Sequence, residues 1–421
     1  MKLKLKQIVK SIASKAKKAS FDLAIISNKR RNEAIINAAQ SLLENKKDIL
    51  FENNKDMKVA KKKKLNKALL DRLFLDDSRI ESMCKGMVSI SKLKDPVGLQ
   101  ISKWKRPNGL EIEKVSVPLG VIGVIYESRP NVAADAASLC LKSCNATILR
   151  GGSESFHSSS VITQIIKQSF LNSGLPDGVL QDIPTSDRDA VGHLLKMDDF
   201  IDVIVPRGGR SLIERIIKDS RIHVIRHLDG ICHTYIHRKS DPNIALKVLI
   251  NAKMRRTGIC GATETLLIDK EVLNSHLPKI ISRLKECGCE IRGDKYIKNI
   301  DQSIKLATEK DWRTEYLDSV ISIKTIKDGV AEAIDHVNTY GSNHTDAIIS
   351  NDKKTVELFL NKVDSGIVMH NTSTQFADGG EFGMGAEIGI STSKLHARGP
   401  VGVSQLTSFK YKVRGNGQIR P

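Results

Sequence analysis

The segment GVIGVIYESRPNVAADAASLCLKSCNATILRGG, residues 120–152, decides the fold of this chain. Apolar runs at 120–126 and 146–150 indicate two strands, and the segment 131–144 between them is typical of a helix, with Asn131 at the position of its N-cap. A strand, a helix and a second strand in this order indicate a parallel sheet covered by helices. We therefore predict an α/β fold.

The same alternation extends toward the C-terminus in two series. Residues 1–95 have the apolar spacing of helices, and the alternating segments 110–118 and 405–413 predict a small projecting sheet. We expect further strands of the first series at 200–206 and 223–227, and a second series with strands at 232–237, 265–268, 320–326, 346–350 and 366–370. The prediction is two open parallel α/β domains and a small β flap.

Two glycine-rich turns lie where such sheets bind ligands, between the carboxyl end of a strand and the next helix. They are Arg150-Gly151-Gly152, which Ser153 follows, and Arg207-Gly208-Gly209. Arginine beside exposed backbone N–H groups suits phosphate, although an ordinary strand-to-helix turn has the same glycines. The dinucleotide fingerprint GxGxxG follows no expected strand, since GMGAEIG at 383–389 lies in a polar glycine-rich stretch.

One cysteine has the surroundings of a nucleophile. In KMRRTGICGATETLL, residues 253–267, Cys260 stands among small residues, with Arg255 and Arg256 upstream. Small neighbours leave the sulfur accessible, and nearby cations favour the thiolate, which is the reactive form. A small apolar residue in a turn before a core strand is the alternative interpretation. Cys260 is thus a candidate for covalent acyl chemistry.

The composition limits the classes of partner. The chain has 421 residues, 40% of them hydrophobic, as is usual for a soluble globular protein of two or three domains. A net charge of +19 raises the question of nucleic acid, but the lysines form only one run, at 58–67, and aromatic residues make up 4%. We expect no nucleic-acid partner. Because no apolar run is long enough to span a bilayer, we expect no membrane partner either.

The cysteines indicate a reducing compartment. There are seven, an odd number, and the basic N-terminus lacks the apolar core of a secretory signal. We therefore expect free thiols and a cytoplasmic location. Cys287 and Cys289 form a C-x-C pair, but no CxxC pair or well-spaced histidines accompany them, so we expect no metal site.

Together these motifs resemble those of the gamma-glutamyl phosphate reductases (glutamate-5-semialdehyde dehydrogenases) of the aldehyde dehydrogenase superfamily. The resemblance covers essentially the whole chain and is carried by 118–152, DVIVPRGG at 202–209, the Cys260 loop and DGGEFGMGAEIGISTSKLHARGPVG at 378–402. It implies NADPH-dependent reduction of L-glutamyl 5-phosphate to L-glutamate 5-semialdehyde and phosphate through a cysteine thioester. This reaction is the second step of proline biosynthesis from glutamate.

The resemblance also implies an organisation into domains and a set of partners. A cofactor-binding domain would comprise 1–105 and 122–230, a catalytic domain 231–370, and an oligomerisation flap the arm 106–121 with the tail 371–421. The implied cofactor is NADP(H) and the implied substrate is a small acyl phosphate. Functional coupling to glutamate 5-kinase and assembly into a homo-oligomer are further implications.

Residue by residue, the resemblance implies Cys260 as the nucleophile and Asn371 in the substrate site. Arg150 stands where the superfamily carries a cofactor-binding lysine, and Gly208 and Gly209 match a turn that lies against the cofactor. The family usually has a lysine where this chain has Ser153. The strength of the preference for NADPH over NADH is therefore an open question.

Acyl transfer also needs donors for an oxyanion and for the substrate's anionic groups. The Cys260 backbone N–H with Asn131 or Arg129 is the candidate set for the oxyanion. For the phosphate and the carboxylate the candidates are Arg129, Arg255, Arg256, Lys394 and Arg398, each with solvated surface charge as its alternative role. His396 is a candidate proton donor, with a structural hydrogen bond as the alternative.

The alternative function is that of another acylating aldehyde dehydrogenase, for example a CoA-dependent one. A hydrolytic dehydrogenase would need a carboxylate to activate water against the thioester. The segment HLDGICH at 227–233 holds only Asp229, and Glu264 enters a strand and is expected to face a structural partner. We therefore expect phosphate rather than water to be the competent acceptor.

Overall fold

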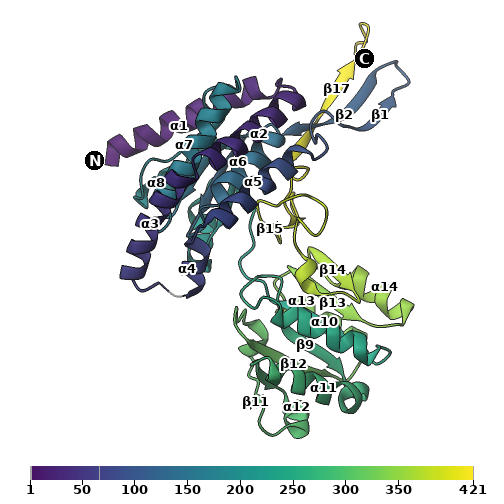
Figure 1. Cartoon of the computed structure of the whole chain (residues 1–421). Coiled ribbons are helices and arrows are strands. Elements are labelled where there is room, and N and C mark those ends of the chain that lie inside the picture. Colours follow the sequence, from purple (N-terminus) through teal and green to yellow (C-terminus); the bar gives the residue numbers. More distant parts are fainter. Residues whose placement is uncertain (1, 66, 421) are drawn as a thin grey trace. The chain divides into compact units, whose positions relative to one another are not determined.

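The computed structural model describes residues 2–65 and 67–420 (Figure 1). The chain forms two compact units, which we describe separately. Unit 1 comprises the residues up to Arg226, Gly383–Gly389 and the residues from Val401 onward, and unit 2 comprises His227–Phe382 with Ile390–Pro400. No helix in the described part of the chain is long and apolar enough to cross a membrane.

Unit 1 is built on a parallel sheet of five strands in the order β5-β4-β3-β6-β7. These strands are β3 (Val121–Tyr126), β4 (Ala146–Gly151), β5 (Leu180–Asp182), β6 (Val203–Arg207) and β7 (His223–Val224). Every residue of the central strand β3 is buried, as expected for a parallel strand covered on both faces. The order of the strands reverses between β3 and β6, and ligands of open α/β sheets bind at such a point.

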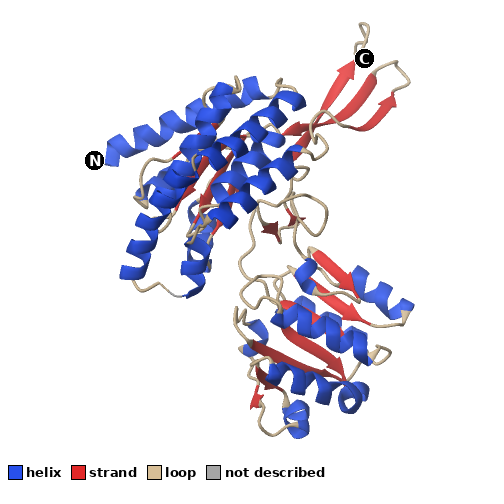
Figure 2. Cartoon of the chain, viewed as in Figure 1, coloured by secondary structure: helices blue, strands red, loops and turns tan. Residues whose placement is uncertain are grey.

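Helices cover the unit 1 sheet (Figure 2). They are α1 (Lys2–Leu23), α2 (Asn28–Glu44), α3 (Lys46–Lys62), α4 (Lys67–Leu73), α5 (Asp77–Ser91), α6 (Val132–Lys142), α7 (Phe156–Asn172), α8 (Asp189–Leu194) and α9 (Arg210–Asp219). On one face of the sheet, Val121 and Ile125 form a core with Val9 of α1 and Ile216 of α9. Helices α6 and α7 contact β3 and β4, and α2 and α5 pack in turn on these helices.

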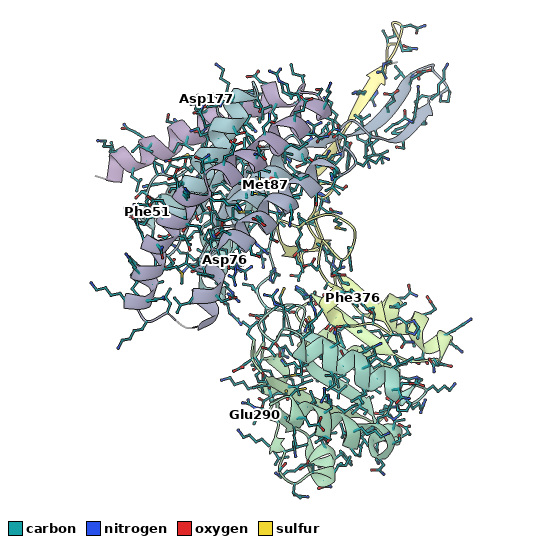
Figure 3. All side chains as sticks on the ribbon, viewed as in Figure 1. Phe51, Asp76, Met87, Asp177, Glu290 and Phe376 are labelled. Atoms are coloured by element: carbon teal, nitrogen blue, oxygen red, sulfur yellow. The ribbon has the colours of Figure 1, made fainter. Side chains whose placement is uncertain are left out.

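The local sequence explains these helices, as α5 illustrates. Asp76 accepts a hydrogen bond from the Arg79 N–H at 2.8 Å and so caps the first turn. The buried residues of α5 include Ile80, Met83 and Met87, whose spacing of three and four places them on one side of the helix. Figure 3 labels Asp76 and Met87. Burial of this stripe, rather than helix propensity alone, holds α5 in place.

Unit 2 is built on a parallel sheet of seven strands in the order β11-β10-β12-β9-β8-β13-β14. They are β8 (Cys232–Ile236), β9 (Thr263–Asp269), β10 (Glu290–Gly293), β11 (Lys305–Leu306), β12 (Val320–Ile326), β13 (Thr345–Ile349) and β14 (Ile367–His370). Strands β8, β9 and β13 lie together at the centre of the sheet, and all their residues are buried.

Helices pack on both faces of the unit 2 sheet. They are α10 (Pro242–Met254), η1 (Lys270–Val272), α11 (Leu273–Glu286), α12 (Lys295–Ile300), η2 (Asp311–Arg313), α13 (Val330–Tyr340), α14 (Lys353–Lys362) and η3 (Thr374–Phe376). Leu266 belongs to the core that contains α10 and α11, whereas its neighbour Leu267 belongs to the core that contains α13 and α14. Successive strand residues point to opposite faces, so the two leucines of β9 join two separate cores.

Two small antiparallel sheets complete the fold. In unit 1, β1 (Gln100–Lys105), β2 (Glu111–Pro118) and β17 (Thr407–Arg414) form a sheet in the order β1-β2-β17, with β2 and β17 paired along eight residues. In unit 2, β15 (Ile390–Ser391) pairs with β16 (Gly399–Pro400). The β1-β2-β17 sheet, which we call the flap, confirms the predicted pairing of 110–118 with the C-terminal strand.

The structure differs from the sequence prediction in several places. Strand β1 was not predicted, and the strand expected at 223–227 is only His223–Val224. The boundary between the units falls at Arg226 rather than at 230. The tail from 371 onward does not belong wholly to the flap, because its parts are divided between unit 1 and unit 2 and only β17 pairs with β2.

Candidate active site

Cys260 lies in the loop between α10 and β9, near the amino end of the unit 2 sheet. The loop follows Met254, the last residue of α10, and ends where β9 begins at Thr263. A turn closes it, with the Ala262 N–H donating to the Ile259 carbonyl at 3.0 Å. Cys260 is half-buried, whereas five of the other six cysteines are buried. Its sulfur is therefore among the more accessible thiols of the chain.

The segment that contains Gly230 and Cys232, also in unit 2, packs against the backbone of Cys260. A Cβ at Gly230 would lie 2.2 Å from the Cys260 carbonyl oxygen, so only glycine allows this close approach. The Cys232 thiol donates to the same oxygen at 3.0 Å. Burial raises the pKa of Cys232 well above its usual value, so this thiol keeps the proton that it donates. Gly230 and Cys232 thus hold the main chain of Cys260.

Two histidines that the sequence analysis did not select lie beside Cys260. One ligand atom each from His227, Cys260 and His344 lies within 4.8 Å of the others. The two imidazole rings meet edge to face, with centroids 5.3 Å apart. His227 is half-buried and His344 is fully buried. The sequence contains a signal for both, since each precedes a buried apolar run, but their proximity follows only from the order of the strands.

The strand order brings these three residues together. His227, Cys260 and His344 precede β8, β9 and β13 respectively, and these strands are parallel neighbours in the sheet. Residues that precede parallel neighbouring strands share one edge of a sheet. The cluster therefore lies at the amino edge, whereas the sequence analysis considered the carboxyl ends as the place for ligands.

The carboxylates near the Cys260 loop are held by specific partners. Glu264 forms an ion pair with Lys253 in which neither side chain is exposed, which agrees with the structural role expected for it. Burial raises the pKa of Glu264 to about 7, while Lys253 acts to lower it. Glu315, which the sequence analysis did not select, accepts a hydrogen bond from the Gly230 N–H at 2.9 Å. Burial also raises the pKa of Glu315.

The arginines beside Cys260 are exposed. Arg255 reaches the Gln375 side-chain oxygen at 3.3 Å, and Gln375 donates through its amide to the carbonyls of Ala252 and Arg256. Gln375 belongs to η3, whose last residue, Phe376, is labelled in Figure 3. It ties the segment after Asn371 to the Cys260 loop, while the two guanidinium groups are exposed.

The other predicted substrate residues of unit 2 make structural contacts. The amide of Asn371 bonds to Ser350 twice, accepting from its N–H at 3.0 Å and donating to its carbonyl at 3.2 Å. Lys394 and Arg398 both form ion pairs with Asp364. These contacts supply the alternative, structural roles that the sequence analysis left open for the two basic residues.

In unit 1, the turn Arg207-Gly208-Gly209 lies at the reversal point between β3 and β6. The Glu127 carboxylate, which follows β3, accepts a hydrogen bond from the Gly209 N–H at 2.9 Å, and a Cβ at Gly208 would lie 2.5 Å from it. An anionic side chain thus occupies the backbone donor that was expected to face a phosphate. In this structure the carboxylate of Glu127 occupies the Gly209 N–H, and phosphate binding at this turn stays a prediction.

The turn Arg150-Gly151-Gly152 differs from the prediction in its arginine. The Arg150 side chain is buried, and its Nη2 donates to the carbonyls of Ser186 and Asp187. Arg150 therefore anchors the loop before α8. Next to the turn is a pocket lined by Tyr126, Gly151, Phe156, Ser159, Thr163 and Asp182. It combines aromatic and polar side chains at the carboxyl ends of β3 and β4, the end of an open α/β sheet at which ligands bind.

Arg129 and Asn131 lie in the loop that leads from β3 into α6. Asn131 occupies the N-cap position of α6, but its side chain does not cap the helix. The predicted N-cap position is thus confirmed, while the Asn131 Nδ2 donates to the Asp135 carboxylate at 2.9 Å. Asn131 is exposed and Arg129 is half-buried.

The predicted site residues fall into two groups. Arg129, Asn131 and the two glycine-rich turns belong to unit 1, and Cys260, Arg255, Arg256 and Asn371 belong to unit 2. Within unit 2 the structure brings both arginines and Cys260 into one loop, and it adds the two histidines and Glu315.

Comparisons with known proteins identify the family. The aldehyde dehydrogenase family model matches residues 3–290. A gamma-glutamyl phosphate reductase of Paramagnetospirillum magneticum is 54% identical over 417 residues, covering 99% of this chain and 98% of that one. One of Rhodospirillum rubrum is 55% identical over 410 residues, covering 97% and 96%.

Solved structures agree with this result. The crystal structure of gamma-glutamyl phosphate reductase from Thermotoga maritima has a TM-score of 0.95 and 38% identity, covering 98% of this chain and 100% of that one. An acetylating aldehyde dehydrogenase from Geobacillus thermoglucosidasius, with a TM-score of 0.70 and 16% identity, shares the fold. The chain belongs to the aldehyde dehydrogenase family and, within it, to the gamma-glutamyl phosphate reductases.

Proposed function

We propose that this chain reduces L-glutamyl 5-phosphate to L-glutamate 5-semialdehyde and phosphate with NADPH, in the pathway from glutamate to proline. The observation that carries the proposal is Cys260, a half-buried thiol on a supported loop with two exposed arginines beside it. Relatives that carry the name of this reductase match the chain over nearly its whole length. The reaction is an oxidoreduction, as the family implies.

The chemistry starts at the sulfur of Cys260. As thiolate it attacks the acyl carbon, the carbon–oxygen bond to phosphate breaks, and inorganic phosphate leaves with the bonding electrons. The thioester that results is reduced by a hydride, which the bound nicotinamide supplies. The hemithioacetal oxyanion then re-forms a carbonyl and expels the Cys260 thiolate, so that the aldehyde leaves and the nucleophile is restored.

Several residues have proposed roles in this sequence. The Cys260 N–H and the Asn131 amide are the proposed donors to the oxyanion. Arg129, Arg255 and Arg256 are proposed to bind the substrate's phosphate and carboxylate, since guanidinium groups pair with such anions in two parallel hydrogen bonds. Asn371 is proposed to act through the loop that it fixes to Ser350.

NADP(H) is the proposed cofactor, bound by unit 1. Both glycine-rich turns lie at the carboxyl ends of strands, where open α/β sheets bind ligands, and Gly152 and Ser153 offer backbone without bulky side chains. Two carboxylates, Glu127 and Glu154, lie at the two glycine-rich turns. A cofactor phosphate at the second turn would displace Glu127 from the Gly209 N–H. Because phosphate and carboxylate compete for the same N–H, we expect the Glu127 side chain to move when the cofactor binds.

The flap is the proposed contact between copies of the chain. Phe409, Tyr411 and Val413 alternate along β17 and are exposed by 47%, 55% and 57%. Trp104 of β1 meets Tyr411 edge to face. Exposed aromatic residues on a strand at the edge of a sheet are typical of surfaces that pair with another chain. A Tyr411→Asp variant should lower the oligomeric state in a light-scattering measurement.

The location and supply of substrate are part of the same proposal. Free thiols suit the cytoplasm, and an acyl phosphate is reactive enough that its supplier should act nearby. We therefore propose functional coupling to glutamate 5-kinase, without requiring a stable complex.

The decisive experiment is a coupled assay with glutamate kinase, ATP and glutamate, in which NADPH oxidation is followed. Cys260→Ser should abolish turnover while circular dichroism and the melting temperature stay unchanged, because a serine alkoxide forms far less readily than a thiolate. Cys287→Ser, at the other half-buried cysteine, is the matched control and should stay active. A panel of acyl-CoA thioesters tests the alternative of a CoA-dependent enzyme, and near-normal activity of Cys260→Ser would refute the mechanism.

A further inference from the structure

We propose that His227, Cys260 and His344 form a binding site for a thiophilic divalent transition-metal ion of the zinc class, and that this ion reversibly blocks the nucleophile. The inference deepens the proposed function and rests on it in one respect, namely that Cys260 is the nucleophile. The occupancy of the site itself requires only the three side chains.

The first argument is convergence. The three residues come from three separate loops, yet one possible ligand atom of each lies within 4.8 Å of the others. The loops precede β8, β9 and β13, which are paired in the centre of the unit 2 sheet. The spacing of these strands therefore sets the distance between the side chains, and no large movement of the backbone is needed to bring them together.

The second argument is the orientation of the histidines. His227 Nδ1 lies 2.9 Å from the Ile390 carbonyl, which can only accept, so Nδ1 carries the proton and Nε2 has the lone pair. His344 Nδ1 lies 2.9 Å from the Thr345 hydroxyl and 3.7 Å from the Cys232 sulfur. The carbonyl thus fixes the tautomer of His227, while the contacts of His344 Nδ1 position its ring, as is usual for histidines that bind metals through the other nitrogen.

The third argument is size. In a tetrahedral zinc site, Zn–N distances of ~2.0–2.1 Å and Zn–S distances of ~2.3 Å place two nitrogens and one sulfur ~3.3–3.6 Å apart. The present separations of at most 4.8 Å exceed this by at most about 1.5 Å. Side-chain rotation of the half-exposed Cys260 and His227 can close the difference, while the buried His344 stays in place.

The fourth argument is the type of ligand. Two imidazoles and a thiolate suit zinc and similar borderline ions, whereas magnesium and calcium take oxygen ligands. Three protein ligands leave a fourth position open for water. Binding requires the Cys260 thiol to lose its proton to solvent, and the sulfur lone pair then belongs to the metal–sulfur bond. An occupied site has no thiolate to attack an acyl carbon, so the ion is an inhibitor and not a cofactor.

The test uses cobalt(II) as a spectroscopic probe on the full chain after treatment with a chelator, in buffer free of phosphate. We expect a sulfur-to-cobalt charge-transfer band and intense visible bands typical of four-coordinate cobalt, saturating at about one ion per chain. Zinc should displace the cobalt and remove the bands. Zinc should also protect Cys260 from alkylation by iodoacetamide, as measured by mass spectrometry of the peptide.

Variants separate this site from adventitious binding. Cys260→Ser should lose the sulfur-to-cobalt band, and His227→Ala should weaken binding ~100-fold, since one of three ligands is gone. Cys287→Ser and His223→Gln are matched controls outside the cluster and should bind cobalt as the wild type does. His344→Gln is the third variant, and because His344 is buried, a melting curve accompanies it. If it does not fold, Cys260→Ser and His227→Ala decide.

Failure of the proposed metal site can be distinguished from failure of the proposed function. Cobalt binding is measured without substrate, so a chain that binds cobalt at Cys260 but does not reduce glutamyl phosphate refutes only the function. A chain that reduces glutamyl phosphate but shows no sulfur-to-cobalt band refutes the metal site. Equal bands in wild type and Cys260→Ser, or unchanged affinity in His227→Ala, would also overturn the inference.

Discussion

Lys253 and Glu264 form a fully buried ion pair that closes the loop carrying Cys260. Lys253 lies in the last turn of α10 and Glu264 is the second residue of β9, so the pair joins the two ends of the loop. The Leu317 N–H donates to the other carboxylate oxygen at 3.3 Å. Both charged groups are therefore paired in the interior of unit 2. Glu264 holds the Cys260 loop in place, and we do not expect it to activate water.

Removal of one partner of this pair should cost more stability than removal of both. Glu264→Gln leaves the Lys253 ammonium buried without its counter-charge, and we expect a loss of about 3–5 kcal/mol in the free energy of unfolding. In Lys253→Met/Glu264→Leu both charges are replaced by apolar groups of similar size, and the loss should be smaller. Urea denaturation measures the free energy of unfolding of the wild type, the single variant and the double variant. Equal losses in the single and double variants would contradict the buried pair.

The sequence predicted the two parallel sheets, and it allows Cys260 to be proposed as the nucleophile, because both depend on local patterns. The buried strand β3 is a continuous apolar run, β12 alternates apolar and polar residues, and glycines with arginines mark the Cys260 loop. The sequence did not predict His227 and His344 as neighbours of Cys260, because their proximity depends on which strands pair. It also did not predict that the side chains of Arg150 and Asn371 form hydrogen bonds with backbone groups. A hydrogen bond to a carbonyl that is distant in the sequence cannot be inferred from the local spacing of residues.

Glu154 should weaken the preference for NADPH. Ser153, where the family usually has lysine, donates to Glu154 at 2.9 Å, and a Cβ at Gly152 would lie 2.8 Å from the same carboxylate. A negative charge over the turn repels a 2′-phosphate. Glu154→Gln should therefore lower the KM for NADPH relative to NADH about fivefold, equivalent to ~1 kcal/mol between exposed charges. Ser153→Lys should shift the ratio in the same direction.

The control for this change is Glu214→Gln, an exposed carboxylate on α9 that pairs with Arg210. It removes one negative charge from unit 1 without touching the first glycine-rich turn. Unchanged cofactor ratios in both Glu154→Gln and Ser153→Lys would mean that this turn does not face the 2′-phosphate.

His336 should make the folded chain sensitive to acid. Burial lowers its pKa to about 2, with His233, Lys324 and Arg313 acting in the same direction, so the ring is neutral in the fold. In the unfolded chain it titrates near its ordinary value of 6.5. Between these values the unfolded state binds the additional proton. The stabilisation is therefore complete above pH 6.5 and is lost as the pH falls toward 2.

The variant that tests this is His336→Phe, which keeps an aromatic ring against Trp312 and Tyr340. Between pH 6 and 4 its unfolding free energy should fall less steeply than that of the wild type, by up to ~1.4 kcal/mol per pH unit. Exposed His223→Gln is the control and should leave the slope unchanged. Parallel curves for wild type and His336→Phe would show that His336 is not the responsible group.

The reverse reaction should depend on inorganic phosphate. Water can replace phosphate as acceptor of the Cys260 thioester only if a carboxylate is placed to activate it. Glu264 is bound to Lys253, and Glu315 accepts the Gly230 N–H. With these groups engaged, NADPH formation from glutamate semialdehyde should stop after at most about one equivalent per active site in phosphate-free buffer, and should resume when phosphate or arsenate is added. Asp229→Asn and Glu315→Gln should not change this behaviour. Sustained formation of glutamate without phosphate in the wild type, lost in one of these two variants, would instead identify that carboxylate as a hydrolytic base.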